Sequence, residues 1–237
     1  MAYDPIGDFE RDYTAIASDY DRTRYGGPAG EFVSRCELAL IRRAIRRHAG
    51  HRRLLIDVAC GTGHFTLGVA DLFDAVIGID FTHAMLSQAR SKALRSSRRF
   101  IGFVQGSTPY LPVRDESCDV VLSTRFLHLF PRERHQDLLV GLMRPLRPGG
   151  VLLVDHDTSF VEWRARHRNP ERRGGFSYHA KEVAPGSRVV GRLGVSGPRL
   201  VALSVGWPGT AQWLSKFFVY PPLNRLATQL LLVYRKL

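Results

Sequence analysis

Short apolar runs alternate with helical patterns along most of the chain from residue 31 onward. Runs of a length typical of buried strands occupy residues 54–58, 75–79, 100–104, 119–122 and 151–154. Helical spacing of apolar residues occupies residues 31–48, 82–94 and 132–143, and one further helix carries Phe65, Val69, Leu72 and Phe73 on one side. This alternation predicts a mostly parallel sheet covered by helices.

The two ends of the chain depart from that alternation. The first 30 residues predict a helix and a glycine-proline linker that precede the sheet and fold over it. Residues 163–187 are polar, basic and rich in turn residues, which predicts a surface excursion, whereas residues 199–205 and 229–234 predict two final strands at an antiparallel edge. The segment LRPGG at residues 146–150 predicts the end of a helix. We therefore expect one α/β domain with a Rossmann-like, doubly wound, seven-stranded and mostly parallel sheet, an antiparallel last strand and an N-terminal helical lid.

Composition fits a protein with a single core. The chain has 237 residues, of which 44% are hydrophobic, and this suffices for one α/β domain of generous size. No segment approaches the roughly 18 apolar residues of a membrane span, and the acidic start does not resemble a signal peptide, so we expect a cytoplasmic protein. The three cysteines form no CxxC pair, which argues against a disulfide framework or a zinc site.

The charge is strongly basic. The balance of 34 Lys and Arg against 22 Asp and Glu gives +12, and lysine occurs only at positions 92, 181, 216 and 236. Nucleic acid, an anionic membrane surface and acidic substrates are partners that such a charge can serve. The densest basic stretch, residues 42–53, lies on a predicted helix and its exit, where a solvated helix face explains it adequately.

The most informative turn follows the first predicted strand. It reads D-x-x-x-G-x-G from Asp57 to Gly63. In an open parallel sheet, ligands bind beyond the carboxyl ends of the strands, and glycines let the backbone turn tightly and approach a ligand closely. A dinucleotide fingerprint needs Gly or Ala where Thr66 stands, and the turn lacks the lysine of a phosphate loop. The turn therefore favours a ligand other than a pyrophosphate.

Asp80 ends the second predicted strand, in the sequence GID. A carboxylate in this position can accept hydrogen bonds from both hydroxyls of a ribose. Together with the turn after the first strand, it predicts an adenosine-type ligand without phosphates.

Four motifs in register resemble one family. DVACGTG, VIGIDFTHAML, FVQGSTPYLPVRDESCDVVLS and LRPGGVLLV resemble the class I S-adenosylmethionine-dependent methyltransferases, in the branch that includes ubiquinone and menaquinone biosynthesis enzymes and many small-molecule methyltransferases. The likeness covers about residues 8–157, and YTAIASDYDRTR resembles the family's amino-terminal helix, which closes over the cofactor. The resemblance implies residues 1–30 as lid and linker, 31–157 as the cofactor-binding core, and 158–237 as the substrate-covering region with the last strands.

The resemblance also implies S-adenosyl-L-methionine as cofactor, with roles at matching positions. Asp57, Ala59 and Gly61 would line its methionine portion, and Gly63 would shape the turn. Asp80 would bind its ribose.

The remaining implied contacts surround the adenine. Phe81 and Met85 would flank the ring, Ser107 and Thr108 would lie at its edge, and Thr124 would offer its backbone carbonyl to the amino group.

One of these positions departs from the family pattern, and the lid supplies two further residues. Tyr20 and Arg24 would reach the cofactor from the lid. The family commonly has Asp where this chain has Ser107. A neutral hydrogen bond contributes about 0.5 to 1.5 kcal/mol against about 1.5 to 3 kcal/mol for a charged one, so we expect cofactor binding about tenfold weaker.

Methyl transfer from a sulfonium needs alignment and a dry site more than acid-base chemistry. His128 and His156 follow the fourth and fifth predicted strands and are the candidate bases for an O- or N-methyl transfer. We expect a small organic acceptor, a pocket built from the amino-terminal helix with residues 160–187 and 207–220, and no metal. A homodimer is a candidate assembly.

Two alternatives remain open. The charge favours an RNA methyltransferase, but the place of the usual N/D-P-P-Y/F motif reads STRF, and no RNA-binding module is visible, so nucleic acid is the less favoured partner. The second alternative is a regulator that binds the cofactor without methylating, for which Ser107 gives slight support.

Overall fold

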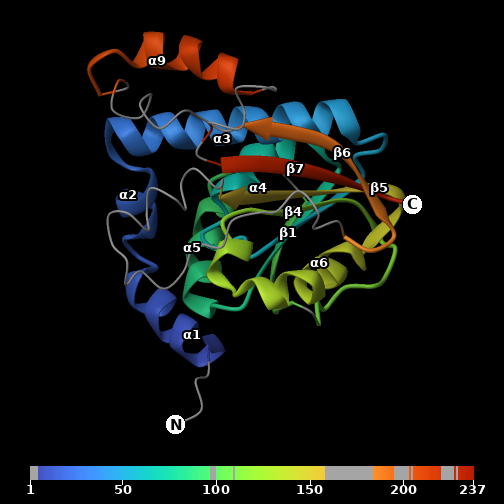
Figure 1. Ribbon diagram of the computed structural model, residues 1–237. Coiled ribbons are helices and arrows are strands. Elements are labelled where there is room, and N and C mark those ends of the chain that lie inside the picture. The colour runs from blue at the N-terminus through green and yellow to red at the C-terminus, as the bar shows by residue number, and fades with distance from the viewer. Residues whose placement is uncertain are drawn as a thin grey trace.

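The computed structural model describes residues 5–96, 100–108, 110–157, 184–194, 203, 205–219, 227 and 229–237. Its centre is a seven-stranded sheet with the order β3-β2-β1-β4-β5-β7-β6 (Figure 1). The strands are β1 (Leu54–Val58), β2 (Ala75–Asp80), β3 (Ile101–Gln105), β4 (Cys118–Ser123), β5 (Leu146–Asp157), β6 (Ser187–Gly194) and β7 (Gln229–Lys236).

The strand order reverses beside β1, which pairs in parallel with both β2 and β4. β3 and β5 continue the parallel sheet outward on either side. β7 then pairs antiparallel with β5 and with β6. The carboxyl end of β1 is therefore the switch point, where an open α/β sheet binds its ligands.

Helices surround this sheet. They are α1 (Pro5–Ile16), α2 (Tyr20–Tyr25), α3 (Gly27–His48), α4 (His64–Val69), α5 (His83–Leu94), α6 (His135–Met143) and α9 (Pro208–Ser215), with short 3₁₀ turns at Ala70–Leu72, Leu127–Leu129, Arg132–Arg134 and Lys216–Phe218. None of the described helices combines the length and the apolar character needed to cross a membrane.

Apolar clusters lie on both faces of the sheet. Ile56 and Val121 join a cluster with Leu139 of α6, whereas Leu55 joins another with Ile45 of α3. Successive strand residues point to opposite faces, so burial on both faces requires near-continuous apolar strands. This confirms the doubly wound, mostly parallel sheet expected from the sequence.

The edge strand differs from the expectation. Of residues 199–205, where a strand was expected, the structure describes Leu203 and Val205, and both are helical; the others lie outside the described residues. The edge strand is β6, in RVVGRLG, at the end of the stretch expected to be a surface excursion and just beyond it. Its pairing with β7 shifts register between Val189 and Gly191. The glycines and arginines of β6 interrupt the alternation of apolar and polar residues that would have predicted a strand.

LRPGG does not end a helix. Leu146 pairs with Cys118, so the segment already belongs to β5, and the register shifts before Val120 meets Val151. Proline is tolerated in a sheet where the ladder is irregular. Pro148 therefore lies beside an irregularity and not at a helix terminus.

The amino-terminal region also differs from one helix and a linker. Two helices, α1 and α2, precede the sheet, and the expected linker is the first turn of α3. Pro28 stands in that first turn, where its missing N–H leaves no hydrogen bond broken.

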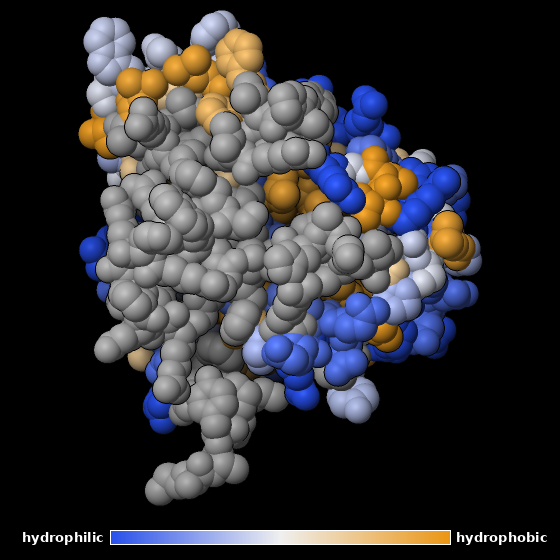
Figure 2. All heavy atoms as spheres, in the orientation of Figure 1, coloured by the Kyte–Doolittle hydropathy of each residue, from blue (hydrophilic) through white to orange (hydrophobic). Residues whose placement is uncertain are grey.

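Two surface features accompany the fold. Trp213 on α9 and Phe217 in the turn after it are more than half exposed, and apolar residues gather there in Figure 2. Ala211, also on α9, is buried against Phe32 and Cys36 of α3. Hydrophilic residues gather on the flank where α3 ends.

Candidate functional site

One pocket lies at the carboxyl end of β1, at the switch point of the sheet. The lining comes from α1 and α2, from the turn after β1, and from the ends of β2, β3 and β4. Its residues are Tyr13, Tyr20, Tyr25, Asp57, Val58, Ala59, Cys60, Gly61, Thr62, Phe65, Asp80, Phe81, Met85, Gly106, Ser107, Thr108, Thr124, Arg125, Phe126, Leu129 and Phe130. Seven of these 21 residues are aromatic, and two carry carboxylates.

The turn after β1 depends on left-handed backbone conformations. Ala59, Gly61 and Gly63 have φ values of 60°, 53° and 74°. A Cβ at Gly61 would meet no atom within 4 Å, so its backbone is open to the pocket. A Cβ at Gly63 would lie 3.1 Å from the Ala89 Cβ and 3.2 Å from the Phe103 ring, so this glycine serves packing as well as the turn.

Asp80 ties the end of β2 to that turn. Its Oδ2 accepts a hydrogen bond from the Gly61 amide at 2.8 Å, and its Oδ1 accepts one from the Thr82 amide at 2.9 Å. Burial raises the pKa of the Asp80 carboxyl, and these backbone hydrogen bonds oppose the rise. Each oxygen has a further lone pair, so the carboxylate can still accept hydrogen bonds from a ligand.

Asp57 lies deeper, with 2% of its surface exposed. Its Oδ2 accepts a hydrogen bond from the Thr66 hydroxyl at 2.5 Å. Burial raises the pKa of Asp57 to about 7; the Thr66 hydrogen bond lowers it, and the nearby Asp80 carboxylate raises it further. Thr66, at the position that excludes a dinucleotide fingerprint, therefore supports this acid.

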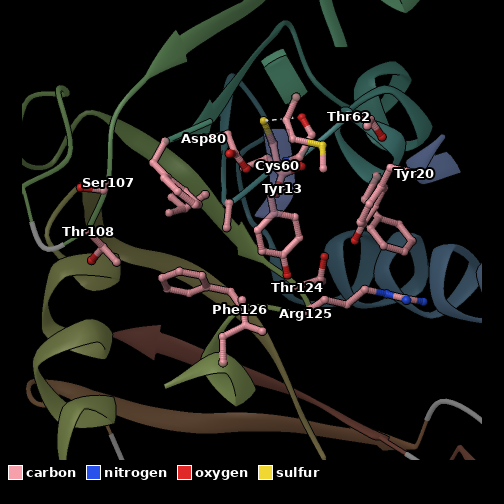
Figure 3. Close-up of a pocket in the computed structure, with 18 of the residues that line it drawn as sticks. Tyr13, Tyr20, Cys60, Thr62, Asp80, Ser107, Thr108, Thr124, Arg125 and Phe126 are labelled. Atoms are coloured by element: carbon pink, nitrogen blue, oxygen red, sulfur yellow. Dashed lines mark hydrogen bonds between the residues drawn. The ribbon is translucent and has the colours of Figure 1, made fainter. Parts of the chain in front are cut away.

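The far end of the pocket carries apolar and hydroxyl groups. Phe81 and Met85 supply apolar wall, and Ser107 and Thr108 follow β3 at the end opposite Tyr20 (Figure 3). The Thr108 Oγ1 is buried without a hydrogen-bond partner among the described residues. A buried hydroxyl of this kind is costly unless a ligand or water satisfies it.

Tyr13 of α1 and Tyr20 and Tyr25 of α2 close the side of the pocket opposite Ser107 and Thr108. Tyr13 projects into the middle of the pocket, and Tyr20 lies nearer its edge (Figure 3). The two rings are 6.3 Å apart, and the Tyr13 ring meets the Phe81 ring edge-on at 6.5 Å. Burial raises the pKa of both tyrosines, so both are neutral phenols at ordinary pH.

Arg125 is a pocket residue that the sequence did not single out. Its φ of 57° is unusual for a residue other than glycine. The Arg125 amide donates to the Asp155 Oδ1 at 2.6 Å, its guanidinium donates to the Glu37 Oε2, and it lies 5.4 Å from the Tyr25 ring centroid. Glu37 lies on α3 among apolar residues and is buried. A buried carboxylate needs a positively charged partner, so Glu37 is the one feature of the sequence that could have pointed to Arg125.

Ten of the twelve residues expected at the cofactor line this one pocket. They are Tyr20, Asp57, Ala59, Gly61, Asp80, Phe81, Met85, Ser107, Thr108 and Thr124. Gly63 does not line it but forms the N-cap of α4, as its expected role in the turn requires. Arg24 is exposed on α2 and stays outside the lining, although its charge opposes the rise in the pKa of Tyr20 that burial causes.

The two candidate bases are not among the lining residues. His156 lies within β5 with 3% of its surface exposed, and its ring centroid is 6.4 Å from that of His135. Burial lowers the pKa of His156 to about 3. His128 is half-buried in the 3₁₀ turn Leu127–Leu129. Neither histidine lines the described pocket, so the assignment of either one as a base stays a prediction.

The structure describes only part of the two segments expected to form the acceptor pocket, residues 160–187 and 207–220. Residues 160–183 lie outside the described residues. Within 207–220, Trp207, Trp213 and Phe217 are exposed on and beside α9, and Phe218 is partly buried against α3. None of these four described aromatic residues lines the pocket. No group of three or more His, Cys, Asp or Glu that could hold a metal occurs in the part of the chain that the structure describes.

Comparison with known proteins finds a methyltransferase family model and relatives named as methyltransferases. The family model described as "Methyltransferase domain" matches residues 56–154. The Saccharomyces cerevisiae protein named "Probable S-adenosylmethionine-dependent methyltransferase CRG1" is 38% identical over 111 residues, which are 45% of this chain and 38% of that protein. The match therefore spans well under two thirds of that relative's length.

A longer match and a structural neighbour extend the likeness beyond the core. The trans-aconitate 2-methyltransferase of Deinococcus radiodurans is 30% identical over 206 residues, 76% of each chain. The crystal structure of magnesium protoporphyrin IX methyltransferase from Synechocystis PCC 6803 with bound SAH has a TM-score of 0.72 at 13% identity, and the superposition covers 99% of this chain and all of that one. At that identity the structural likeness concerns the fold alone.

Proposed function

Since the chain belongs to the class I S-adenosylmethionine-dependent methyltransferases, we propose that it transfers a methyl group from this cofactor to a small organic acceptor. The observation that carries the proposal is that ten residues expected at the cofactor line one pocket, to which α2, α5 and the carboxyl ends of β1, β2, β3 and β4 contribute. Those residues lie as far apart in sequence as Tyr20 and Thr124, so their convergence is a property of the fold.

The residues of the pocket fit the chemistry of the cofactor. The Asp80 carboxylate can accept hydrogen bonds from a ribose diol, and the open backbone at Gly61 admits a closely approaching ligand. Phe81 and Met85 offer apolar faces to an adenine, and the buried Thr108 hydroxyl lacks a partner that an adenine edge can provide. The fit thus includes both shape and unsatisfied polarity.

When bound, the cofactor supplies a methyl group already activated on a sulfonium. The protein then has to align the acceptor and keep water out. The neutral rings of Tyr13, Tyr20 and Tyr25 cover one side of the pocket, and Phe126 and Phe130 line another. Aromatic faces also attract a cation, which favours retention of the charged cofactor.

The acceptor is proposed at the level of class. Arg125 is the basic residue of the described lining, and Glu37 balances its charge. Because the Deinococcus relative is named for trans-aconitate, a small polycarboxylate is the first acceptor to test. Neither His128 nor His156 lines the pocket, so the proposal does not depend on a histidine base.

Calorimetric titration with S-adenosylmethionine and S-adenosylhomocysteine tests the cofactor assignment. Asp80→Asn should raise both Kd values about tenfold or more, because a charge-assisted acceptor of ribose hydroxyls is lost. Ser107→Asp should lower them by up to about tenfold, because a charged acceptor replaces a neutral one. Asp74→Asn, at an exposed position before β2, is the matched control and should leave both unchanged. Failure of the wild-type protein to bind either compound would refute the proposal.

Release of S-adenosylhomocysteine in the presence of candidate acceptors tests transfer itself. Tight cofactor binding without release for any acceptor would instead support the regulator that binds and does not methylate. The homodimer and the cytoplasmic location remain predictions, which the mass in solution and localisation of the tagged chain would test.

A further inference from the structure

A single carboxylate connects the short helix α2 to two parts of the core. The Asp21 Oδ1 accepts a hydrogen bond from the Thr62 hydroxyl at 2.5 Å, and its Oδ2 accepts one from the Lys92 ammonium at 2.5 Å. Thr62 lies between Gly61 and Gly63 in the turn after β1, and Lys92 lies in the last turn of α5. Asp21 therefore fixes α2 against the turn and against α5 at once.

At the other end of α2, an aromatic contact holds the helix to the start of α4. Tyr25 stacks on His64, with ring centroids 3.9 Å apart and an interplanar angle of 15°. His64 directly follows Gly63, so this contact also reaches the turn after β1. α1 and α2 run along one flank of the molecule, beside α5 (Figure 1). Between its two attachments, α2 presents Tyr20 to the pocket.

We infer that Asp21 is a positioning residue: its carboxylate latches α2 to Thr62 and Lys92, so that Tyr20 and Tyr25 close the pocket and slow the exit of the bound cofactor. The inference rests on the proposed function for the identity of the ligand. Asp21 itself does not line the pocket, so its effect passes through the lining residues that it holds, namely the tyrosines of α2 and Thr62.

The latch should act locally. The Lys92 and Asp21 side chains are 31% and 40% exposed, and exposed ion pairs contribute little to global stability. A six-residue helix at the edge of the molecule opens according to its few contacts. Loss of the Asp21 carboxylate should therefore free α2 while the sheet stays folded.

Asp21→Ala tests the inference, with Asp19→Ala as its matched control. Asp19 lies two residues away and pairs with Arg22 at 3.0 Å on the same segment, and its side chain makes no capping hydrogen bond. Amide hydrogen exchange across residues 20–25 of the ligand-free protein should be about tenfold faster in Asp21→Ala and within about twofold of wild type in Asp19→Ala.

The second readout is the dissociation rate of S-adenosylhomocysteine in stopped-flow competition. It should rise about five- to tenfold in Asp21→Ala, with the association rate changed by less than about threefold, because related complexes differ mostly in dissociation. Lys92→Met should accelerate both exchange and dissociation, and Asp21→Lys combined with Lys92→Asp should reverse part of the effect by restoring the ion pair.

Unchanged exchange in Asp21→Ala would overturn the latch. Faster exchange with unchanged dissociation would also overturn the inference, because α2 would then move without affecting ligand exit. If the wild-type protein bound no cofactor, the proposed function would fail, and the exchange of residues 20–25 alone would decide whether Asp21 holds α2.

Discussion

At the scale of the residue, the site is governed by two buried acids with different tasks. Asp80 and Asp57 expose 6% and 2% of their surface. Asp80 uses both oxygens to hold backbone amides of neighbouring segments, whereas Asp57 rests on the Thr66 hydroxyl. The sequence predicted that both acids lie at strand ends. It did not predict their hydrogen-bond partners, because each hydrogen bond depends on how the strand packs against the neighbouring turn or helix.

The raised pKa of Asp57 predicts how stability depends on pH. The usual value of 3.8 applies to the unfolded chain, and the folded protein has a value of about 7. Between these values the folded protein keeps a proton that the unfolded chain has released. The contribution of Asp57 to the free energy of unfolding is therefore fully present below the lower pKa and is lost as the pH rises through the higher one. Asp57→Asn cannot ionise and avoids that loss.

Urea unfolding of the cofactor-free proteins at several pH values between about 4 and 7 tests this linkage. The free energy of unfolding of Asp57→Asn, relative to wild type, should increase across the range by up to about 4 kcal/mol, since each pKa unit corresponds to about 1.4 kcal/mol. A difference that stays constant with pH would show that Asp57 ionises normally in the folded protein.

At the scale of the element, the turn between β1 and α4 is the part most constrained by backbone conformation. Its left-handed residues bring the chain from a buried strand into a helix within five residues after Val58. Glycine spacing identified this turn in the sequence because conformational preference is local. The edge strand β6 was missed for the opposite reason, since its glycines and arginines become a strand only through pairing with β7.

Gly63→Ala should destabilise the protein by about 1 to 2 kcal/mol or more. Its φ of 74° is costly for alanine, and the added Cβ crowds Ala89 and Phe103 at 3.1 and 3.2 Å. Gly102→Ala in β3 is the control, because a Cβ there would meet no atom within 4 Å and alanine suits a strand interior at least as well as glycine. Chemical denaturation compares the two variants, and equal stabilities would show that the turn tolerates the strain.

At the scale of the whole molecule, the exposed arginines of α3 lie outside the lining of the pocket. Arg43, Arg46 and Arg47 are exposed on α3. The described lining of the pocket contains one basic residue, Arg125, and two acids. An enzyme that held RNA at its active site would need phosphate-binding side chains around that site. The charge of +12 therefore does not by itself favour RNA as the acceptor.

Binding of mixed-sequence single-stranded RNA should be non-specific and strongly dependent on salt. Its affinity should fall about tenfold or more between 50 and 200 mM salt, and a triple change of Arg43, Arg46 and Arg47 to Glu should weaken it further. Transfer of a labelled methyl group to that RNA should not be detected, as filter counting would measure. Methylated RNA would restore the RNA methyltransferase as the leading function.

The sequence by itself determined the parallel core, the turn after β1 and the acids at the ends of β1 and β2, because strand periodicity, glycine conformation and strand-end position are local properties. Only the tertiary structure decided the position of β6, the burial of His156 outside the pocket lining, and the contacts of Arg125 and Asp21. Arg125 meets Glu37 across 88 residues and Asp21 meets Lys92 across 71. Such contacts depend on how distant segments pack together, and no local pattern in either segment identifies its partner.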